Sequence, residues 1–395
     1  MLELERLTNK VEAMAQRASE QLEQRQKQLD DLLQKLHDNR TNWSEIRRTL
    51  NLAQAMTDAK LFRAARPFDE DEPLDVTVAP VDPPHYAILN GVDGSQILPD
   101  RHAPYLYYLI NVGIITYFHG RELAPTTETF PELVYPENED ADEGEFVDDG
   151  GVVNIRRDLQ EISSLAEVCW QQRQETDVRV AVLDQRLLYW PTVRGQDEGL
   201  RVLIGWQDAM TKVRDSGALL CGYIDRPAKS SVVTMLRVLD IEEPGFNTDT
   251  LNYRKRRALP DTALFGRLLR PGQRSKIFID ISDHNEQFYQ RDRLNEVCFF
   301  YFNAGGGSIA RIDIPRSVAE DRIAVAQLHG LLWSQCQFNG GYPYLMTRAD
   351  EVAVVRRQDK ESLDIMIANM MERYGIRRDF TGKQQGKNLT RARHR

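Results

Sequence analysis

Two stretches decide the fold: residues 88–95, Ile-Leu-Asn-Gly-Val-Asp-Gly-Ser, and residues 180–185, Val-Ala-Val-Leu-Asp-Gln. Each is a short apolar run typical of a buried strand, and each delivers an aspartate at its carboxyl end, Asp93 or Asp184. A buried carboxylate is costly unless it is paired or bound to a metal. Because ligands of open α/β sheets bind beyond the carboxyl ends of the strands, the two aspartates predict a site for divalent cations. Taken singly, each aspartate is also explained as the cap of a turn or a helix.

Further strands and helices surround these two stretches. The residue patterns predict additional strands at residues 106–118, 217–224, 276–281, 297–302 and 309–314. They predict helices at residues 154–173, 318–335 and 349–374. Strands interleaved with helices favour a mixed α/β fold, in which a central mixed sheet is flanked by helices. The strand order does not follow from the pattern.

The N-terminal part of the chain is predicted to be helical. Apolar residues recur at spacings of three, four or seven over residues 1–38, which places them on one face of a long helix, and a second helix is predicted over residues 41–63. We expect a helical extension at residues 1–66, a proline-rich linker at 67–84, the main domain at 85–376 and a basic tail at 377–395. The extension either forms a dimer seam or packs against the body, and the pattern does not choose.

The composition of the chain predicts where the protein is located but says less about its function. No apolar run reaches the roughly 18–20 residues that a membrane helix needs, and the N-terminus lacks an apolar signal core. The four cysteines lie far apart and form no Cys-x-x-Cys pair, which argues against zinc and disulfides. These features predict a cytoplasmic protein. The net charge of −9 is not the usual footprint of a nucleic-acid-binding protein, but an acidic stretch at 132–149 and the basic tail segregate the charge.

Two further carboxylates are candidates for the same site. Glu161 lies beside the apolar stripe of the helix predicted at 154–173, so it needs a partner; Glu167 of the same helix is the alternative. Asp350 follows a Gly-Gly-Tyr-Pro loop and is expected in the first turn of a helix that begins near Thr347. A carboxylate there also suits the helix dipole, which is the ordinary explanation.

These residues, in this order, resemble the NurA nuclease family. The matching segments are Val92-Asp93-Gly-Ser95, the helix from Arg157 to Glu161, Leu183-Asp184, and the motif from Gly341-Tyr342-Pro to Asp350. The resemblance covers about residues 85–360 and implies an RNase H-like fold. It also implies a catalytic set of Asp93, Glu161, Asp184 and Asp350 as metal ligands, with Tyr342 beside them.

The chain departs from the family's pattern at one motif. The family usually has Asp-Gly-Ser-Leu where this chain has Asp184-Gln-Arg-Leu187, so the tight turn after the aspartate must be built without glycine. Arg186 is a candidate contact to a DNA phosphate. Lys229 is a second candidate, although an exposed lysine without a role explains it equally well.

The resemblance implies a metal-dependent DNA nuclease that uses one or two Mn²⁺ or Mg²⁺ ions, since carboxylate oxygens suit these ions. It further implies 5′-3′ exonuclease and single-strand endonuclease activity in DNA end processing and double-strand break repair. The implied assembly is a homodimer with a HerA-like hexameric ATPase; this chain has no Walker A motif of its own. Two alternatives remain: a non-catalytic relative that binds DNA or the ATPase, and a phosphodiesterase of the same fold that acts on RNA or small nucleotides.

Overall fold

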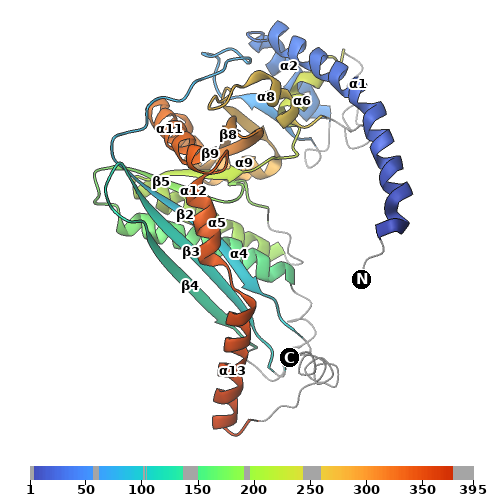
Figure 1. Cartoon of the computed structure of the whole chain (residues 1–395). Coiled ribbons are helices and arrows are strands. Elements are labelled where there is room, and N and C mark those ends of the chain that lie inside the picture. Colours follow the sequence, from blue (N-terminus) through green and yellow to red (C-terminus); the bar gives the residue numbers. More distant parts are fainter. Residues whose placement is uncertain are drawn as a thin grey trace. The chain divides into compact units, whose positions relative to one another are not determined.

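The computed structural model describes residues 4–56, 62–100, 103, 105–136, 150–190, 196–242 and 259–376 (Figure 1). The chain forms two compact units, each assembled from segments far apart in the sequence. Unit 1 comprises residues 1–83 and 223–342, and unit 2 comprises residues 84–222 and 343–395. This division cuts across the main domain expected at residues 85–376. The basic tail at 377–395 and most of the acidic stretch lie outside the described residues.

The sheet of unit 2 is mixed, as predicted. Its central strand, β2 (Ala87–Ile97), pairs antiparallel with β3 (Tyr108–His119), which pairs antiparallel with β4 (Thr126–Val134). On its other side β2 pairs parallel with β5 (Val178–Leu183), and β5 pairs parallel with β6 (Leu219–Ile224). The order β4-β3-β2-β5-β6, with three antiparallel strands followed by two parallel ones, is the arrangement of an RNase H-like sheet.

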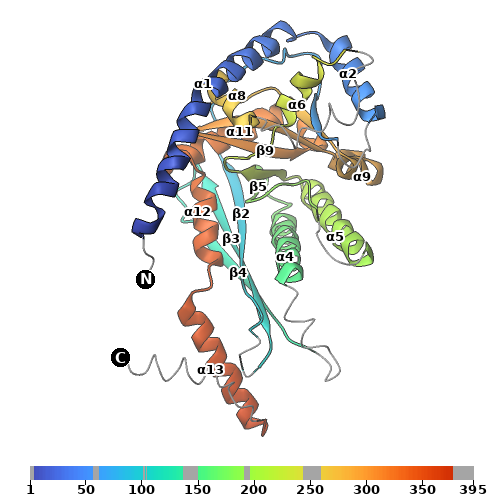
Figure 2. The same cartoon turned by 90° about the vertical axis from the view of Figure 1, so that its right-hand side faces the viewer.

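Helices cover both faces of this sheet. In Figure 2, α4 (Gly150–Gln171) and α5 (Gln196–Asp215) lie on one side of β2 and β3, and α12 (Tyr344–Ala353) lies on the other. The single helix predicted at 349–374 is therefore wrong: α12 ends at Ala353, and α13 (Arg357–Arg373) begins after a break. None of the α13 side chains is buried.

The helix α12 lies directly on the backbone of the sheet because two strand glycines leave room for it. A Cβ atom at Gly91 would lie 2.6 Å from Leu345 Cγ, and one at Gly113 would lie 2.5 Å from the backbone nitrogen of Ala353. Glycine in a strand interior often marks such a close approach. The height of α12 above the sheet, and with it the position of Asp350, depends on these two missing side chains.

Unit 1 contains a second group of strands, in the order β1 (Ala64–Pro67), β7 (Phe278–Ile281), β8 (Val297–Gly305) and β9 (Ser308–Pro315), all antiparallel. Every residue of β8 up to Ala304 is buried because both faces of the strand are covered. Phe300 and Phe302 contact His329 of α11 (Arg322–Phe338). The alternate residues Phe299 and Tyr301 belong to an apolar core cluster.

That core joins the strands to the N-terminal helices. It includes residues of α1 (Thr8–Asp38), α2 (Trp43–Met56), α6 (Ser231–Val238) and α8 (Asp261–Leu268). The last third of α1 contributes three buried leucines at helical spacing, Leu29, Leu32 and Leu36. The expected long helix therefore exists, preceded by the 3₁₀ turn η1 (Leu4–Leu7), and its carboxyl end packs against the body of unit 1. Its first half leaves Val11, Met14 and Leu22 exposed.

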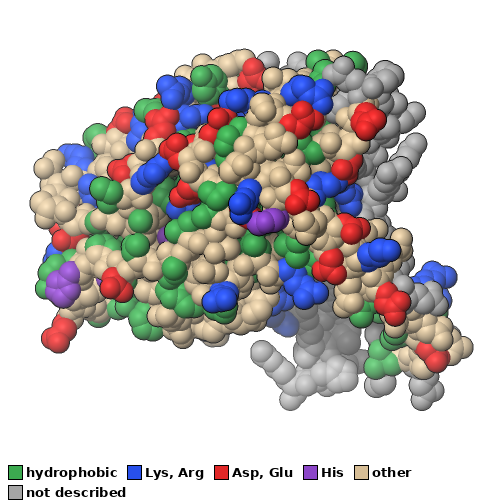
Figure 3. Space-filling view, turned by 90° about the horizontal axis from the view of Figure 1, so that it is seen from above, with side chains coloured by type: hydrophobic (Ala, Val, Ile, Leu, Met, Phe, Trp, Pro, Cys, Tyr) green, Lys and Arg blue, Asp and Glu red, His purple; other side chains and the backbone are tan. Residues whose placement is uncertain are grey.

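The described part of unit 1 also contains three short helical elements. They are α9 (Asp283–Arg291), η3 (Arg293–Asn295) and α10 (Arg316–Ala319). Within the described ranges, no helix combines the length and the apolar character that crossing a membrane requires. On the face drawn in Figure 3, positive and negative side chains are interspersed rather than gathered by sign.

Replacing Gly113 with alanine tests the contact between α12 and the sheet. The added Cβ meets backbone atoms of Val352 and Ala353, which cannot rotate away, so we expect a loss of about 1–3 kcal/mol in the free energy of unfolding. Gly151→Ala in α4 is the matched control, because nothing lies within 4 Å of its added Cβ, and it should leave stability unchanged or slightly raised. Urea unfolding measures both; equal stability of the two variants would contradict the close packing.

Candidate active site

The pairing of β2 with β5 brings two of the predicted carboxylates together. Val92 is the register partner of Leu183, so the next residues, Asp93 and Asp184, stand at neighbouring positions on two parallel strands. The prediction that both strands end at these residues holds only for β5. Pairing with β5 stops at Val92, but β2 continues to Ile97 against β3.

Glu161 reaches the same place from α4. It lies on the buried face of that helix and is only 4% exposed. Its approach to β2 requires Gly94, because a Cβ atom there would lie 2.4 Å from Glu161 Oε1. The glycine that follows Asp93 is thus needed to admit the third carboxylate, although the Asp-Gly pair alone indicates only a turn.

The fourth carboxylate, Asp350, is carried by α12. This helix begins at Tyr344, so the prediction that Asp350 lies in a first turn starting near Thr347 is wrong, and the helix dipole does not account for it. Ser95 of β2 anchors the end of this helix: its Oγ donates to the carbonyl of Ala353 at 2.5 Å and accepts from the Val355 N–H at 3.1 Å. Asn111 Nδ2 donates to the same carbonyl at 2.8 Å.

The carboxylates act on one another electrostatically. Burial raises the pKa of Asp93 to about 6, the Gly94 N–H bonded to Asp93 Oδ1 at 2.8 Å opposes this rise, and the charges of Asp184 and Asp350 add to it. Burial also raises the pKa of Glu161 well above its ordinary value, and Asp93 contributes to that rise. The carboxylates whose charges act on Asp93 share one electrostatic environment with it. All four predicted carboxylates are therefore linked through Asp93.

Two neighbours stabilise the ionised form of Glu161. Arg157, one turn earlier in α4, places Nε 3.1 Å from Glu161 Oε1 as an ion pair. Gln185, which directly follows Asp184, donates from Nε2 to Glu161 Oε2 at 2.8 Å. Neither neighbour was singled out from the sequence; the available signals were the Arg157–Glu161 spacing of four in the family-like helix and the departure from glycine at Gln185.

The turn after Asp184 is built without its own glycine because the adjacent strand supplies one. A Cβ atom at Gly222 of β6 would lie 2.3 Å from the carbonyl oxygen of Gln185. The turn is then held by Trp206 of α5, whose Nε1 donates to the Leu187 carbonyl at 2.9 Å. The Asp184-Gln-Arg-Leu sequence is therefore compatible with the site.

This donor set suits a hard divalent cation. Four carboxylates without a thiolate or an imidazole are ligands of the kind that Mg²⁺ and Mn²⁺ prefer, and a cation between Asp93 and Asp184 would offset the charge of both aspartates. Among the described residues, no three Asp, Glu, His or Cys side chains converge as a preformed ligand set. Glu161 contributes to this lack of convergence, because each of its two carboxylate oxygens already has a protein partner.

The remaining predicted residues have different surroundings. Glu167, the alternative to Glu161, is exposed and forms an ion pair with Lys212 of α5. Arg186 is exposed just beyond β5. In unit 1, the ring of Tyr342 packs edge-on against Tyr223, with ring centroids 5.4 Å apart. Gly341 (φ 113°) precedes it in a backbone conformation that favours glycine.

Lys229 belongs to a charge cluster inside unit 1. Its Nζ lies 3.4 Å from Asp280 Oδ2, and Nη2 of the buried Arg311 lies 3.1 Å from the same oxygen. Arg311 Nε also donates to Asp313 Oδ1 at 2.6 Å. The Lys229 side chain is 37% exposed. Its charge thus has a structural partner, and a contact with DNA stays a prediction.

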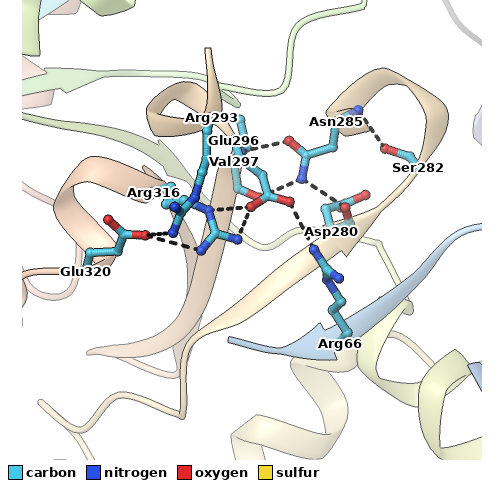
Figure 4. A network of polar contacts seen from close by, with 9 residues as sticks. All are labelled: Arg66, Asp280, Ser282, Asn285, Arg293, Glu296, Val297, Arg316 and Glu320. Carbon is cyan, nitrogen blue, oxygen red and sulfur yellow. Dashed lines mark hydrogen bonds and ion pairs between the residues drawn. The ribbon is translucent and has the colours of Figure 1, made fainter. Parts of the chain in front are cut away.

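Unit 1 also carries an arginine network that the sequence did not suggest (Figure 4). The buried Glu296 accepts from Arg316 Nε at 2.6 Å and from Arg66 Nη2 at 3.1 Å, while Arg293 pairs with Glu320 at 2.7 Å. The network lines a cavity of about 480 Å³. Each guanidinium group is paired with a carboxylate, so the network adds little net positive charge to the cavity. We assign the network a structural role, joining β1 to α10 and η3.

The chain is similar to a known protein family and to several solved structures. A model of the NurA domain matches residues 89–355. None of the curated proteins matches the chain. Among solved structures it is similar to the NurA nuclease from Sulfolobus solfataricus, with 14% identity, a TM-score of 0.43 and coverage of 84% of this chain and 94% of that chain. It is also similar to the catalytic domain of human Endonuclease V, with 14% identity, a TM-score of 0.31 and coverage of 72% and 92%.

The sheet of unit 2 is RNase H-like, and the pairing of its parallel strands β2 and β5 sets Asp93 beside Asp184. The family match spans more than half of the chain and includes Asp93, Glu161, Asp184, Tyr342 and Asp350. This chain therefore belongs to the NurA nuclease family.

The raised pKa of Asp93 predicts how the metal-free protein responds to pH. The unfolded carboxyl ionises near its ordinary value of 3.8, but the folded one keeps its proton up to about 6, so stability falls as pH rises through this window. Asp93→Asn removes the cost and keeps the acceptor for the Gly94 N–H. In EDTA at pH 7.5 we expect the variant to be more stable by about 1–2 kcal/mol, and at pH 4 we expect no difference.

Urea unfolding with EDTA at both pH values measures this effect. Glu167→Gln is the control, because that glutamate is exposed and should show no such pH-dependent gain. A stability difference between wild type and Asp93→Asn that is the same at both pH values would mean that the ionised carboxylate is not the source.

Proposed function

We propose that this protein is a metal-dependent nuclease that hydrolyses DNA phosphodiester bonds at the carboxylate cluster of unit 2. The single observation that carries the proposal is the β2–β5 register, which sets Asp93 beside Asp184 within the family match. Repulsion among these groups is a cost to folding, and binding a cation offsets such a cost.

In the proposed mechanism, Asp93, Glu161, Asp184 and Asp350 hold the ion or ions, and the family resemblance adds Tyr342 to the catalytic set. Bound Mn²⁺ or Mg²⁺ would supply an activated water and stabilise charge on the phosphate and on the leaving oxygen. The chain's own contribution is positional. The β2–β5 register fixes the two aspartates, Gly94 admits Glu161, and Ser95 fixes the end of the helix that carries Asp350.

The finer assignments rest on the family resemblance. We propose 5′-3′ exonuclease and single-strand endonuclease action in DNA end processing and double-strand break repair, with one or two Mn²⁺ or Mg²⁺ ions. We also propose a homodimer and a HerA-like hexameric ATPase as partners, with Arg186 and Lys229 as contacts to DNA. A cytoplasmic location is supported by the four cysteines, which are buried and form no disulfide.

Cleavage of labelled linear and circular single-stranded DNA, with Mn²⁺, Mg²⁺ or EDTA, tests the proposal. We expect metal-dependent cleavage that falls by at least about a hundredfold in Asp93→Ala and in Asp184→Ala, since each loses a metal ligand. Glu167→Ala is the control: it lies on the helix of Glu161 but is exposed, and it should keep wild-type activity.

Cleavage of the circular substrate would separate endonuclease from exonuclease action. A parallel assay on RNA distinguishes a deoxyribonuclease from a phosphodiesterase of broader range. If the folded wild-type protein cleaves nothing with either metal, alone or with its ATPase, the binding-module alternative replaces the nuclease. Equal cleavage by wild type and Asp93→Ala would remove this site from the reaction.

A further inference from the structure

Arg157 is held in place independently of Glu161. Its Nη1 donates to Gln96 Oε1 at 2.9 Å, and its Nη2 donates to Asp158 Oδ1 at 2.7 Å. Gln96 is itself held by the amide of Asn154, at 2.9 Å. The guanidinium is therefore fastened to β2 and to α4 by its two terminal nitrogens, and its side chain is 27% exposed.

The third nitrogen of the guanidinium faces the carboxylate cluster. Arg157 Nε lies 3.1 Å from Glu161 Oε1, but it is buried and its geometry does not make a hydrogen bond. The contact between Nε and Glu161 is thus an ion pair without a hydrogen bond. It depends less on geometry than the two hydrogen bonds that anchor the guanidinium. Its positive charge also acts on Asp93. Glu161 Oε2 is engaged by Gln185 on the opposite side.

We propose that Arg157 is the resident counter-cation of this site, a fixed positive charge that neutralises Glu161 in the absence of metal and lowers the affinity of the site for a divalent ion. This inference rests on the proposed function, because it requires that Glu161 and Asp93 ligate the ion. It goes beyond that function by assigning a role to a residue that is not itself a ligand.

The anchoring of Arg157 determines how a metal ion can take the place of Arg157 Nε beside Glu161. Because Gln96 and Asp158 hold the guanidinium, the Nε contact with Glu161 can be given up while the positive charge stays where it is. An incoming ion gains an oxygen of Glu161 but is repelled by the remaining charge. The protein thereby avoids an unpaired buried carboxylate in its metal-free form and binds metal more weakly than the four carboxylates alone would.

A purely structural role for Arg157 predicts the opposite sign. If the arginine only positioned Glu161, its removal would disorder a ligand and weaken metal binding. If it is a counter-cation, its removal strengthens metal binding. The direction of the change in metal affinity therefore separates the two roles.

The test is Mn²⁺ binding to the full chain, measured by titration calorimetry and by the electron paramagnetic resonance signal of free Mn²⁺. We expect Arg157→Met to bind Mn²⁺ about tenfold more tightly than wild type, because a unit charge close to a divalent ion is removed. Arg157→Lys, which keeps the charge, should return the affinity toward wild type. Arg156→Met is the matched control: Arg156 is the preceding residue, pairs with Tyr108, and should bind Mn²⁺ as wild type does.

Thermal unfolding supplies a second measurement. In EDTA, Arg157→Met should melt below Arg156→Met, since Glu161 loses its charge partner, and Mn²⁺ should raise its Tm by more than it raises that of wild type. If Arg157→Met does not fold, Arg157→Gln removes the charge with a polar side chain and replaces it in both experiments.

The outcomes are distinguishable from those of the proposed function. If wild type binds Mn²⁺ and cleaves DNA but the charge-removing variant binds Mn²⁺ equally or more weakly, the counter-cation role is wrong and the nuclease stands. If neither wild type nor the variant binds Mn²⁺, both proposals fall. Tighter binding by the charge-removing variant alone, with Arg156→Met unchanged, supports the counter-cation.

Discussion

The parallel register between β2 and β5 is the constraint on which the site depends. Because Val92 pairs with Leu183, two aspartates that are 91 positions apart in the chain (184 − 93) stand at the end of the same strand pairing. A slip of one residue would turn one of these side chains to the other face of the sheet. The apolar runs before Asp93 and Asp184 are buried on both faces.

Glycines determine how closely the other carboxylates approach that point. Gly94 leaves space for the Glu161 carboxylate, while Gly91 and Gly113 leave space for the helix that carries Asp350. Ser95 then anchors the end of that helix through two hydrogen bonds. The Asp-Gly-Ser motif therefore combines a candidate ligand, a space and an anchor in three successive residues, which explains why the chemistry needs those residue types together.

Concentrating carboxylates opposes folding, and the protein offsets this cost locally. Arg157 and Gln185 each engage one oxygen of Glu161, and a backbone N–H satisfies Asp93. Unit 1 uses the same device for structural purposes: Arg311 pairs with Asp280 and Asp313 in its core, and every carboxylate of that cluster has a cation beside it. In unit 2, by contrast, the charges of Asp184 and Asp350 act on Asp93, which marks a candidate metal site.

The sequence by itself determined the mixed α/β class, most of the strands, and the candidate ligands Asp93 and Asp184, with Glu161 or Glu167 as a third, because alternation, apolar runs and an acid beside an apolar stripe are local properties of the chain. Tertiary structure decided what depends on distant residues. It separated buried Glu161 from exposed Glu167, broke the C-terminal helix where Ser95 bonds to the backbone after α12, and set Arg157 between Gln96 and Glu161. Such contacts join segments far apart in the chain, and no local pattern encodes which partner a polar side chain will meet.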